Sequence, residues 1–254
     1  MYPFHPSLVQ QCLCYNLMAD FYKYRDPRLH IHYYKLHFQC MQQLMAKTQG
    51  IPGPSFDHKR RQDQALVRFL HASPGTPAID VYVNGEQVFD NVSYQILSRY
   101  LTFPEGEHEI EIYKAGQTET PVLSGTVSLE EDEHYTFAVG GTLDNLDFYE
   151  VTEAQEAPAD AAMVRFWHLS PDAPAVDITE EEGEVIFSDV SFGEVTEYAE
   201  LSPGSYTLEV RSAGTAVPVM TLRNLQFSGG QAYSVTAMGL AEGTPRLETL
   251  IIQP

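Results

Sequence analysis

The stretch VRFLHASPGTPAIDVYVNGEQVFDNVSY at residues 67–94 decides the fold, because it returns as VRFWHLSPDAPAVDITEEEGEVIFSDVSF at residues 164–192. A repeat of about a hundred residues predicts two domains, since each copy must bury a hydrophobic core of its own. Residues that both copies share are first expected to serve the fold. What is particular to this protein is expected in the differences between the copies and in the unrepeated residues before them.

Short strands are the dominant pattern within each copy. Segments such as Ala78–Val83 and Tyr206–Val210 are rich in β-branched and aromatic residues and end at Gly, Pro, Asn or acidic turns. Asn84-Gly85 predicts a tight hairpin turn, because both residues accept the positive φ of a type I′ turn. About seven such strands in some 85 residues is the spacing of a β-sandwich.

The segment before the repeats has a helical period instead. Apolar residues recur at every third or fourth position in residues 7–24 and again in 28–48. Asp26-Pro27 separates the two runs, because a residue before proline is pushed out of the α region. We therefore predict an αα-hairpin. Its apolar faces are wider than one partner helix covers, so we expect it to pack on its own β-domain, on another chain or on both.

The chain is thus predicted to contain a helical hairpin, a linker, a first β-sandwich, a second linker and a second β-sandwich. Both linkers have the composition of loops: the first is rich in Gly and Pro, and the second, in the acidic joint VTEAQEAPADAA, is rich in Ala and Glu. The predicted bounds are 1–49 for the hairpin, 50–65 for the first linker, 66–152 for the first sandwich, 153–162 for the second linker and 163–254 for the second sandwich.

The phrase VRFLHASPGTPAIDVYVNG, together with its weaker twin VRFWHLSPDAPAVDI, resembles the opening of the DUF4397 domain, an uncharacterised bacterial module. The resemblance extends through both copies. It implies antiparallel β-sandwiches of the Ig-like or transthyretin-like type, usually in tandem and usually on secreted or wall-attached proteins, with no established catalytic activity. The expected fold class is mainly β, with two such tandem domains after an αα-hairpin that is additional to the family pattern.

Charge is distributed unevenly along the chain, whose formal net charge is −20. Residues 1–65 hold eight Lys or Arg and four acidic residues, whereas the remainder holds seven basic and 31 acidic residues. A surface as acidic as that of the repeats repels nucleic acid, so we expect no nucleic-acid partner. We expect protein partners or self-association through the N-terminal helices, and the basic segment is also complementary in charge to the acidic domains of a neighbouring copy.

Two indications of location point in different directions. Residues 1–17 have no basic start and no clean apolar core, so they predict no signal peptide and a cytoplasmic protein. No stretch approaches the roughly 18 apolar residues that span a bilayer. The family resemblance implies a cell surface instead. A spore-envelope or cell-surface component that is carried outward without a signal would reconcile the two.

Each copy places a histidine, a serine and an aspartate close together in the sequence, which invites a hydrolase interpretation. Catalysis would need the serine oxygen against a histidine nitrogen with the carboxylate behind it. Two residues apart on one strand, the histidine and the serine lie roughly 6–7 Å apart, and each serine precedes a proline in a turn context. We therefore predict no catalytic residues and a structural role for the polar pairs. The residues in question are His71, Ser73 and Asp80 in the first copy, and His168, Ser170 and Asp177 in the second.

The helical segment holds all three cysteines, Cys12, Cys14 and Cys40, and five histidines in residues 1–65. Cys12 and Cys14 are two positions apart on a predicted helix and cannot both point at one metal ion. We therefore predict no metal site and no cofactor. The cysteines are expected to pack as small apolar residues, and they are candidate assembly residues because an odd cysteine count leaves intermolecular disulfides open.

Acidic clusters and aromatic residues leave two binding alternatives open. The runs at 130–133 and 180–182 supply hard oxygen ligands, but they lack the spacing of an EF-hand loop and equally suit charged hairpin tips. Tyrosines and Trp167 could form a sugar-binding platform, although a place in a core or at the domain joint accounts for Trp167 with fewer assumptions.

The sequence favours a non-enzymatic structural or interaction protein of a bacterial cell or spore surface. In this interpretation the β-sandwiches are spacers or binding modules, and the helical hairpin serves assembly or anchoring. The alternatives are a carbohydrate- or calcium-binding module, with a polysaccharide as a further partner, and a hydrolase that uses the His-x-Ser…Asp triplets.

Overall fold

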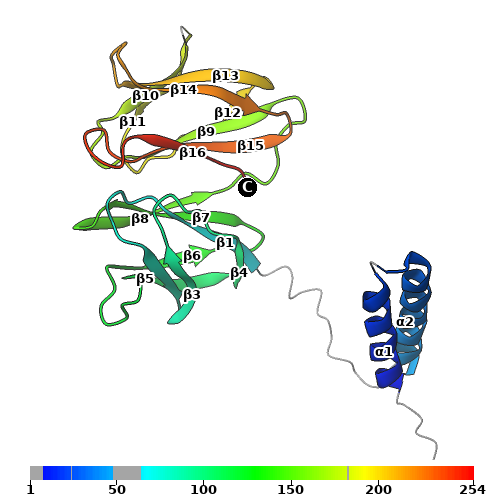
Figure 1. The fold of residues 1–254 in the computed structure, drawn as a ribbon. Coiled ribbons are helices and arrows are strands. Elements are labelled where there is room, and N and C mark those ends of the chain that lie inside the picture. Colours follow the sequence, from blue (N-terminus) through cyan, green and yellow to red (C-terminus); the bar gives the residue numbers. More distant parts are fainter. Residues whose placement is uncertain (1–7, 24, 48–63, 182) are drawn as a thin grey trace, which may run out of the picture. The chain divides into compact units, whose positions relative to one another are not determined.

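The computed structural model describes residues 8–23, 25–47, 64–181 and 183–254 (Figure 1). The predicted first linker therefore lies outside the described residues except for its last two positions. The chain divides into two compact units, Met1–Arg60 and Arg61–Pro254, which are described separately. We call the second the β unit. No helix among the described residues is long and apolar enough to cross a membrane.

The first unit is the predicted αα-hairpin, built from α1 (Leu8–Tyr22) and α2 (Pro27–Lys47). The carboxylate of Asp26 accepts the backbone N–H groups of Arg28 at 2.9 Å and Leu29 at 3.2 Å, so it caps the start of α2. The proline that follows Asp26 occupies the first helical position, where its missing N–H costs nothing.

The two helices are joined along one side by a disulfide and by side-chain contacts. Cys12 and Cys40 form the disulfide, with their Cα atoms 5.5 Å apart. Two histidines of α2 add hydrogen bonds to backbone carbonyls of α1: His30 to Ala19 at 2.8 Å and His37 to Cys12 at 2.9 Å. This side of each helix therefore faces the other helix.

The first sandwich consists of two four-stranded sheets with the orders β4-β1-β7-β8 and β3-β2-β5-β6. Its strands are β1 (Gln64–His71), β2 (Ile79–Val83), β3 (Glu86–Val92), β4 (Leu101–Pro104), β5 (Gly106–Lys114), β6 (Leu123–Leu129), β7 (His134–Thr142) and β8 (Asn145–Thr152).

The second sandwich repeats this topology, with sheets in the orders β12-β9-β15-β16 and β11-β10-β13-β14. Its strands are β9 (Ala162–Leu169), β10 (Val176–Glu180), β11 (Val185–Val190), β12 (Ala199–Leu201), β13 (Gly204–Ser212), β14 (Pro218–Phe227), β15 (Gln231–Met238) and β16 (Glu248–Ile252).

One sheet of each sandwich is mixed rather than purely antiparallel. β1 pairs parallel with β7, and β9 pairs parallel with β15, while every other strand pairing in the four sheets is antiparallel. The parallel pairs join the first and seventh strands of each copy, so they depend on contacts across the whole repeat. The local alternation of residues cannot indicate such a pairing.

Alternation along β1 sends side chains to two different cores. Val67 and Phe69 face the opposing sheet of the first sandwich, in the core that fills that domain. Leu70 and Ala72 face the other way and belong to a separate cluster, which also includes Trp167 and Leu169 of the second sandwich. The inner sheets of the two sandwiches therefore pack on each other, and the β unit is a stack of four sheets with a third core at its centre.

The burial of individual strands reflects this stacking. The last five residues of β1 are all buried, as are seven consecutive residues of β7, whereas exposed and half-buried residues alternate along most of β6. A strand covered on both faces is expected to be apolar on both faces. Trp167 is fully buried in the central layer, which places it at the joint between the domains, one of the two positions that the sequence left open.

Candidate functional site

The shared His-x-Ser motif holds a loop in place in both copies. Pro77 O lies 3.1 Å from His71 Nε2, and since a carbonyl only accepts, Nε2 carries the hydrogen. Nδ1 then accepts the backbone N–H of Ser73 at 3.4 Å. In the second copy, His168 makes the same two contacts with Pro174 and Ser170, at 3.1 and 3.2 Å. Each imidazole thus lies across its own loop, and both of its ring nitrogens are hydrogen-bonded to backbone groups of that loop.

The serine hydroxyls are directed elsewhere. Ser73 Oγ donates to Gly141 O at 2.7 Å, and Ser170 Oγ donates to Gly239 O at 2.8 Å. Both serines and both histidines are completely buried. A nucleophilic serine would need a free hydroxyl against a basic histidine nitrogen that is open to substrate. The described geometry offers neither feature, and it explains the motif as a backbone clamp.

The aspartates of the motif hold a second set of backbone groups. Asp80 accepts the N–H groups of Asn91 at 2.7 Å and Gly116 at 2.9 Å. Asp177 accepts the equivalent groups of Asp189 and Gly214, both at 2.8 Å. We expected His71 with Asp80, and His168 with Asp177, to act as polar pairs. In each copy the histidine and the aspartate hold backbone groups of different segments.

Burial and hydrogen bonds shift the pKa values of three groups in the two motifs. Removal of water from around His71 and His168 lowers the pKa of both imidazoles below the ordinary 6.5, although the hydrogen bonds to Pro77 and Pro174 oppose the change. The pKa of Asp177 is lowered by the hydrogen bonds from Asp189 and Gly214. The folded protein therefore favours neutral His71 and His168 and a charged Asp177.

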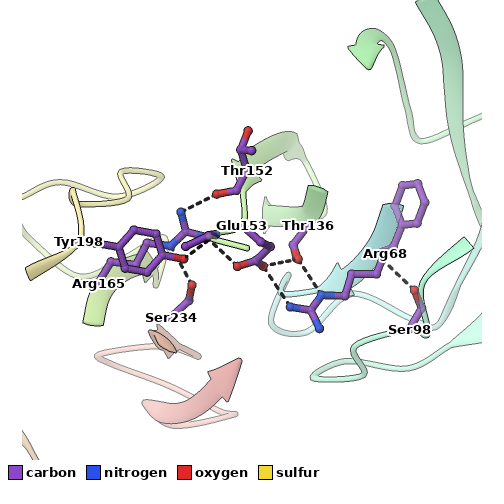
Figure 2. Close-up of polar contacts among 10 residues, drawn as sticks. Arg68, Ser98, Thr136, Thr152, Glu153, Arg165, Tyr198 and Ser234 are labelled. Carbon is purple, nitrogen blue, oxygen red and sulfur yellow. Dashed lines mark hydrogen bonds and ion pairs between the residues drawn. The ribbon is translucent and has the colours of Figure 1, made fainter. Parts of the chain in front are cut away.

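A buried ion cluster joins the two sandwiches, and sequence reasoning missed it. Glu153 follows β8 directly, and its carboxylate is fully buried. Its Oε1 lies 3.1 Å from Arg68 Nη2, and its Oε2 lies 3.0 Å from Arg165 Nη2. Figure 2 shows the carboxylate between the two guanidinium groups. One acid thus binds an arginine from each copy of the repeat.

Each arginine has matching secondary partners in its own sandwich. Arg68 Nε donates to Thr136 Oγ1 at 2.8 Å, and Arg165 Nε donates to Ser234 Oγ at 2.8 Å (Figure 2). In the sheet register, Arg68 is paired with Thr136 across β1 and β7, and Arg165 with Ser234 across β9 and β15. The parallel strand pairs therefore place equivalent hydroxyl groups beside the two equivalent arginines, and Glu153 lies between these arginines. Each arginine also contacts a tyrosine.

The two tyrosines are stacked on the guanidinium groups. The Cζ atom of Arg68 lies 4.4 Å from the ring centroid of Tyr100, and that of Arg165 lies 4.5 Å from that of Tyr198. Burial raises the pKa of Tyr100 to about 12, so the ring stays neutral and available for a cation–π contact. Two cations and one anion share this site, and the tyrosine faces help to compensate the excess positive charge.

The signal for this cluster was present in the repeat but is weak. Arg68 and Arg165 occupy the same position of VRF in both copies, between residues that alternate into the core. On the face of a strand that points away from its own core, a charged side chain usually reaches water. Here the other sandwich covers that face, and the local sequence does not indicate this. Glu153 stands in a joint with several acids, and composition alone does not single it out.

Two of the three cysteines have partners within the chain. The disulfide between Cys12 and Cys40 corrects the expectation that these two cysteines are free for assembly. They lie on the inner rows of their helices, which is why they meet. Cys14 is an exposed free thiol, and its role in assembly stays a prediction. Among the described residues, no group of three or more His, Cys, Asp or Glu side chains converges as metal ligands would.

The comparison with protein families finds two successive matches in the chain. The sequence profile described as "Domain of unknown function (DUF4397)" matches residues 65–179 and 181–253. No curated protein shows significant similarity to the chain.

The solved structures that match the chain are only distantly similar to it. A carbohydrate-binding module of family CBM26 from Eubacterium rectale Amy13K, solved in complex with maltoheptaose, is 8% identical with a TM-score of 0.24, over 75% of this chain and 97% of that one. The Bacillus anthracis TIE protein is 12% identical with a TM-score of 0.23, over 70% of this chain and 34% of that one.

A fimbrial assembly protein from Parabacteroides distasonis is 7% identical with a TM-score of 0.18, over 76% of this chain and 96% of that protein. The assignment to a family rests on the sequence profile, which covers most of the chain and both copies of the repeat. This chain belongs to the DUF4397 family.

Proposed function

We propose that the protein is a non-enzymatic structural or interaction protein of a bacterial cell or spore surface. The β unit is a rigid module in this proposal, and the helical hairpin attaches it to other molecules. The observation that carries the proposal is the use of the shared residues. The motif histidines, serines and aspartates hold backbone, and the shared arginines hold one sandwich against the other.

The helical hairpin supports the second half of the proposal. Seven of the thirteen large apolar side chains that are exposed in the described residues lie in its two short helices. Exposed apolar clusters of this kind mark interaction sites. The disulfide between Cys12 and Cys40 suits an oxidising location outside the cytoplasm, which is the location that the family resemblance implies.

A comparison of the full-length chain with a variant that lacks residues 1–60 tests the proposal. The β unit has three apolar clusters of its own, so the shortened variant is expected to fold. Tagged full-length protein should fractionate with the cell or spore surface, and the shortened variant should stay soluble. Equal distribution of the two proteins would contradict an attaching role for the hairpin.

A second measurement addresses the alternatives. Purified protein is heated with calcium, with a panel of polysaccharides and with chromogenic esters. We expect no rise in the unfolding temperature and no hydrolysis. A saturable rise with one polysaccharide would replace the structural role with a binding role, and hydrolysis that is lost in Ser73→Ala would overturn the non-enzymatic assignment.

A further inference from the structure

The outer face of α1 carries a row of exposed apolar side chains. Leu13, Leu17 and Phe21 are 59%, 69% and 52% exposed. Their spacing of four residues places them one above the other on a single side of the helix. We call these three residues the α1 stripe. The row contains no charged residue, so contact of these side chains with water is unfavourable.

A similar row lies on α2. Ile31, Tyr34 and Phe38 are 53%, 59% and 59% exposed, and their spacing of three and four residues again defines one side of the helix. We call them the α2 stripe. The two stripes come from consecutive helices, so the hairpin presents two apolar surfaces to its surroundings.

The stripes point away from the contact between the helices. At about 100° per residue, the centre of each stripe lies roughly 150° around its helix from the disulfide-bonded Cys12 or Cys40. The hairpin therefore presents one stripe on the far side of each helix. A flat lipid surface can cover only one of them, whereas protein neighbours can cover both.

The exposed area of each stripe suits the apolar centre of a protein contact. At roughly 100 Å² for each half-exposed large side chain, each stripe leaves about 300 Å² of mainly apolar surface in water. Each partner in an interface of standard size buries about 800 Å², so the residues that flank a stripe must supply the rest of the contact.

A partner that covers a stripe must present an apolar surface of similar length. In the described part of the β unit, whose charge is strongly negative, the exposed large apolar side chains are few, and only Val217 and Val219 lie close together in the sequence. They are Ile96, Leu143, Val185, Val217, Val219 and Ile251. Among the described residues, the surface that matches a stripe in length and chemistry is another stripe.

We propose that the hairpins of separate copies of this chain pack stripe against stripe, so that each hairpin has two neighbours. This inference rests on the proposed attaching role of the hairpin and names a second copy as the partner. Because the stripes lie on separate sides, the assembly grows beyond a dimer. Lys35 and Arg28 are exposed on α2, and these like charges oppose association at low salt.

Mass measurement by size exclusion with light scattering tests the proposal on the full chain at tens of micromolar. Four proteins are compared: wild type, Leu17→Glu on the α1 stripe, Phe38→Glu on the α2 stripe, and the double variant. We expect a wild-type mass above twice the chain mass of 28.5 kDa, at most a dimer for either single variant, and a monomer for the double variant. The wild-type mass should rise with salt, because the contact is apolar.

The matched control is Val217→Glu, which introduces the same charge at a 66% exposed apolar residue of the β unit and should keep the wild-type mass. Circular dichroism of the double variant should show unchanged helix content, because the substituted side chains face outward. A monomeric wild type, or a double variant with the wild-type mass, would overturn the proposal. Association that weakens with salt would also overturn it, in favour of a basic hairpin bound to acidic β units.

Two further outcomes separate this inference from the proposed function. If removal of residues 1–60 abolishes association and the double variant does not, the hairpin attaches through another surface, and only the stripe contact fails. If wild type is monomeric yet floats with phosphatidylserine vesicles, and the double variant does not float, a membrane replaces the second copy.

Discussion

The β unit and the helical hairpin both contain elements that are apolar on two sides, and they differ in where the second side is covered. In the inner sheets of the β unit, the second side is covered within the chain, because Leu70 of one sandwich and Trp167 of the other share a cluster. In the hairpin, Leu17 and Phe38 stay exposed. Duplication has therefore supplied each β-sandwich with a partner within the chain, whereas the unrepeated hairpin has no second copy here to cover its outer sides.

In the β unit, the largest loss of unfolding free energy is expected from Glu153→Ala. The substitution leaves Arg68 and Arg165 buried without a counter-ion, and such a loss costs about 3–5 kcal/mol of unfolding free energy. Chemical denaturation of the β unit measures it. Wild type should unfold in one transition, and the variant should separate into two as the sandwiches lose their contact. Glu131→Ala, at an exposed turn, is the control and should change stability by less than about 0.5 kcal/mol.

Trp167→Leu comes next, since it gives the second copy the residue that the first copy has at Leu70. The indole fills the central layer, and its Nε1 has no hydrogen-bond partner among the described residues, so the change removes packing alone. We expect a loss of about 1–3 kcal/mol from the cavity. An unchanged denaturation midpoint would mean that the central layer is less tightly packed than described.

An effect of similar size, different in the two copies, is expected from Asp80→Asn and Asp177→Asn. Either amide must turn an N–H toward one of the two backbone donors that the carboxylate accepted, so one charge-assisted bond is lost, at about 1.5–3 kcal/mol. Asp80 is 5% exposed and Asp177 is more open to water, so the loss should be larger in the first copy. Thermal unfolding of the two variants under one condition measures this difference, and a larger loss for Asp177→Asn would contradict it.

The smallest effect is a dependence on pH. The pKa values of His71 and His168 are lowered in the folded state, so below about 6.5 the unfolded chain binds protons that the folded chain does not. The stability from the neutral imidazoles is fully present above that pH and is lost as the pH falls toward the lowered values. Unfolding midpoints at pH 7.5 and 5.5 measure the loss. His71→Gln should reduce the pH dependence more than His168→Gln, because Glu194 raises the pKa of His168 and opposes the shift.

The sequence predicted most of the fold and little of the site, for physical reasons that particular residues show. The alternation of Val67 and Phe69 with polar or outward residues is local, and so is the capping of α2 by Asp26; both are readable from neighbouring positions. The pairing of β1 with β7 joins Arg68 to Thr136, 68 residues away, and no local pattern encodes it. Glu153 lies in a joint with other acids, and only the approach of two domains decides which of them is buried.

Glu153 lies between the repeats, in the residues that join them, and its carboxylate serves both equally. A single repeat cut out at its natural borders would carry a bare arginine on an uncovered apolar sheet. For a graft, a truncation or a designed array, the smallest transferable piece is therefore the pair together with its joint. The joint is as much a part of the module as either repeat, because a synthetic linker of equal length would connect the sandwiches but would leave Arg68 and Arg165 without their shared carboxylate.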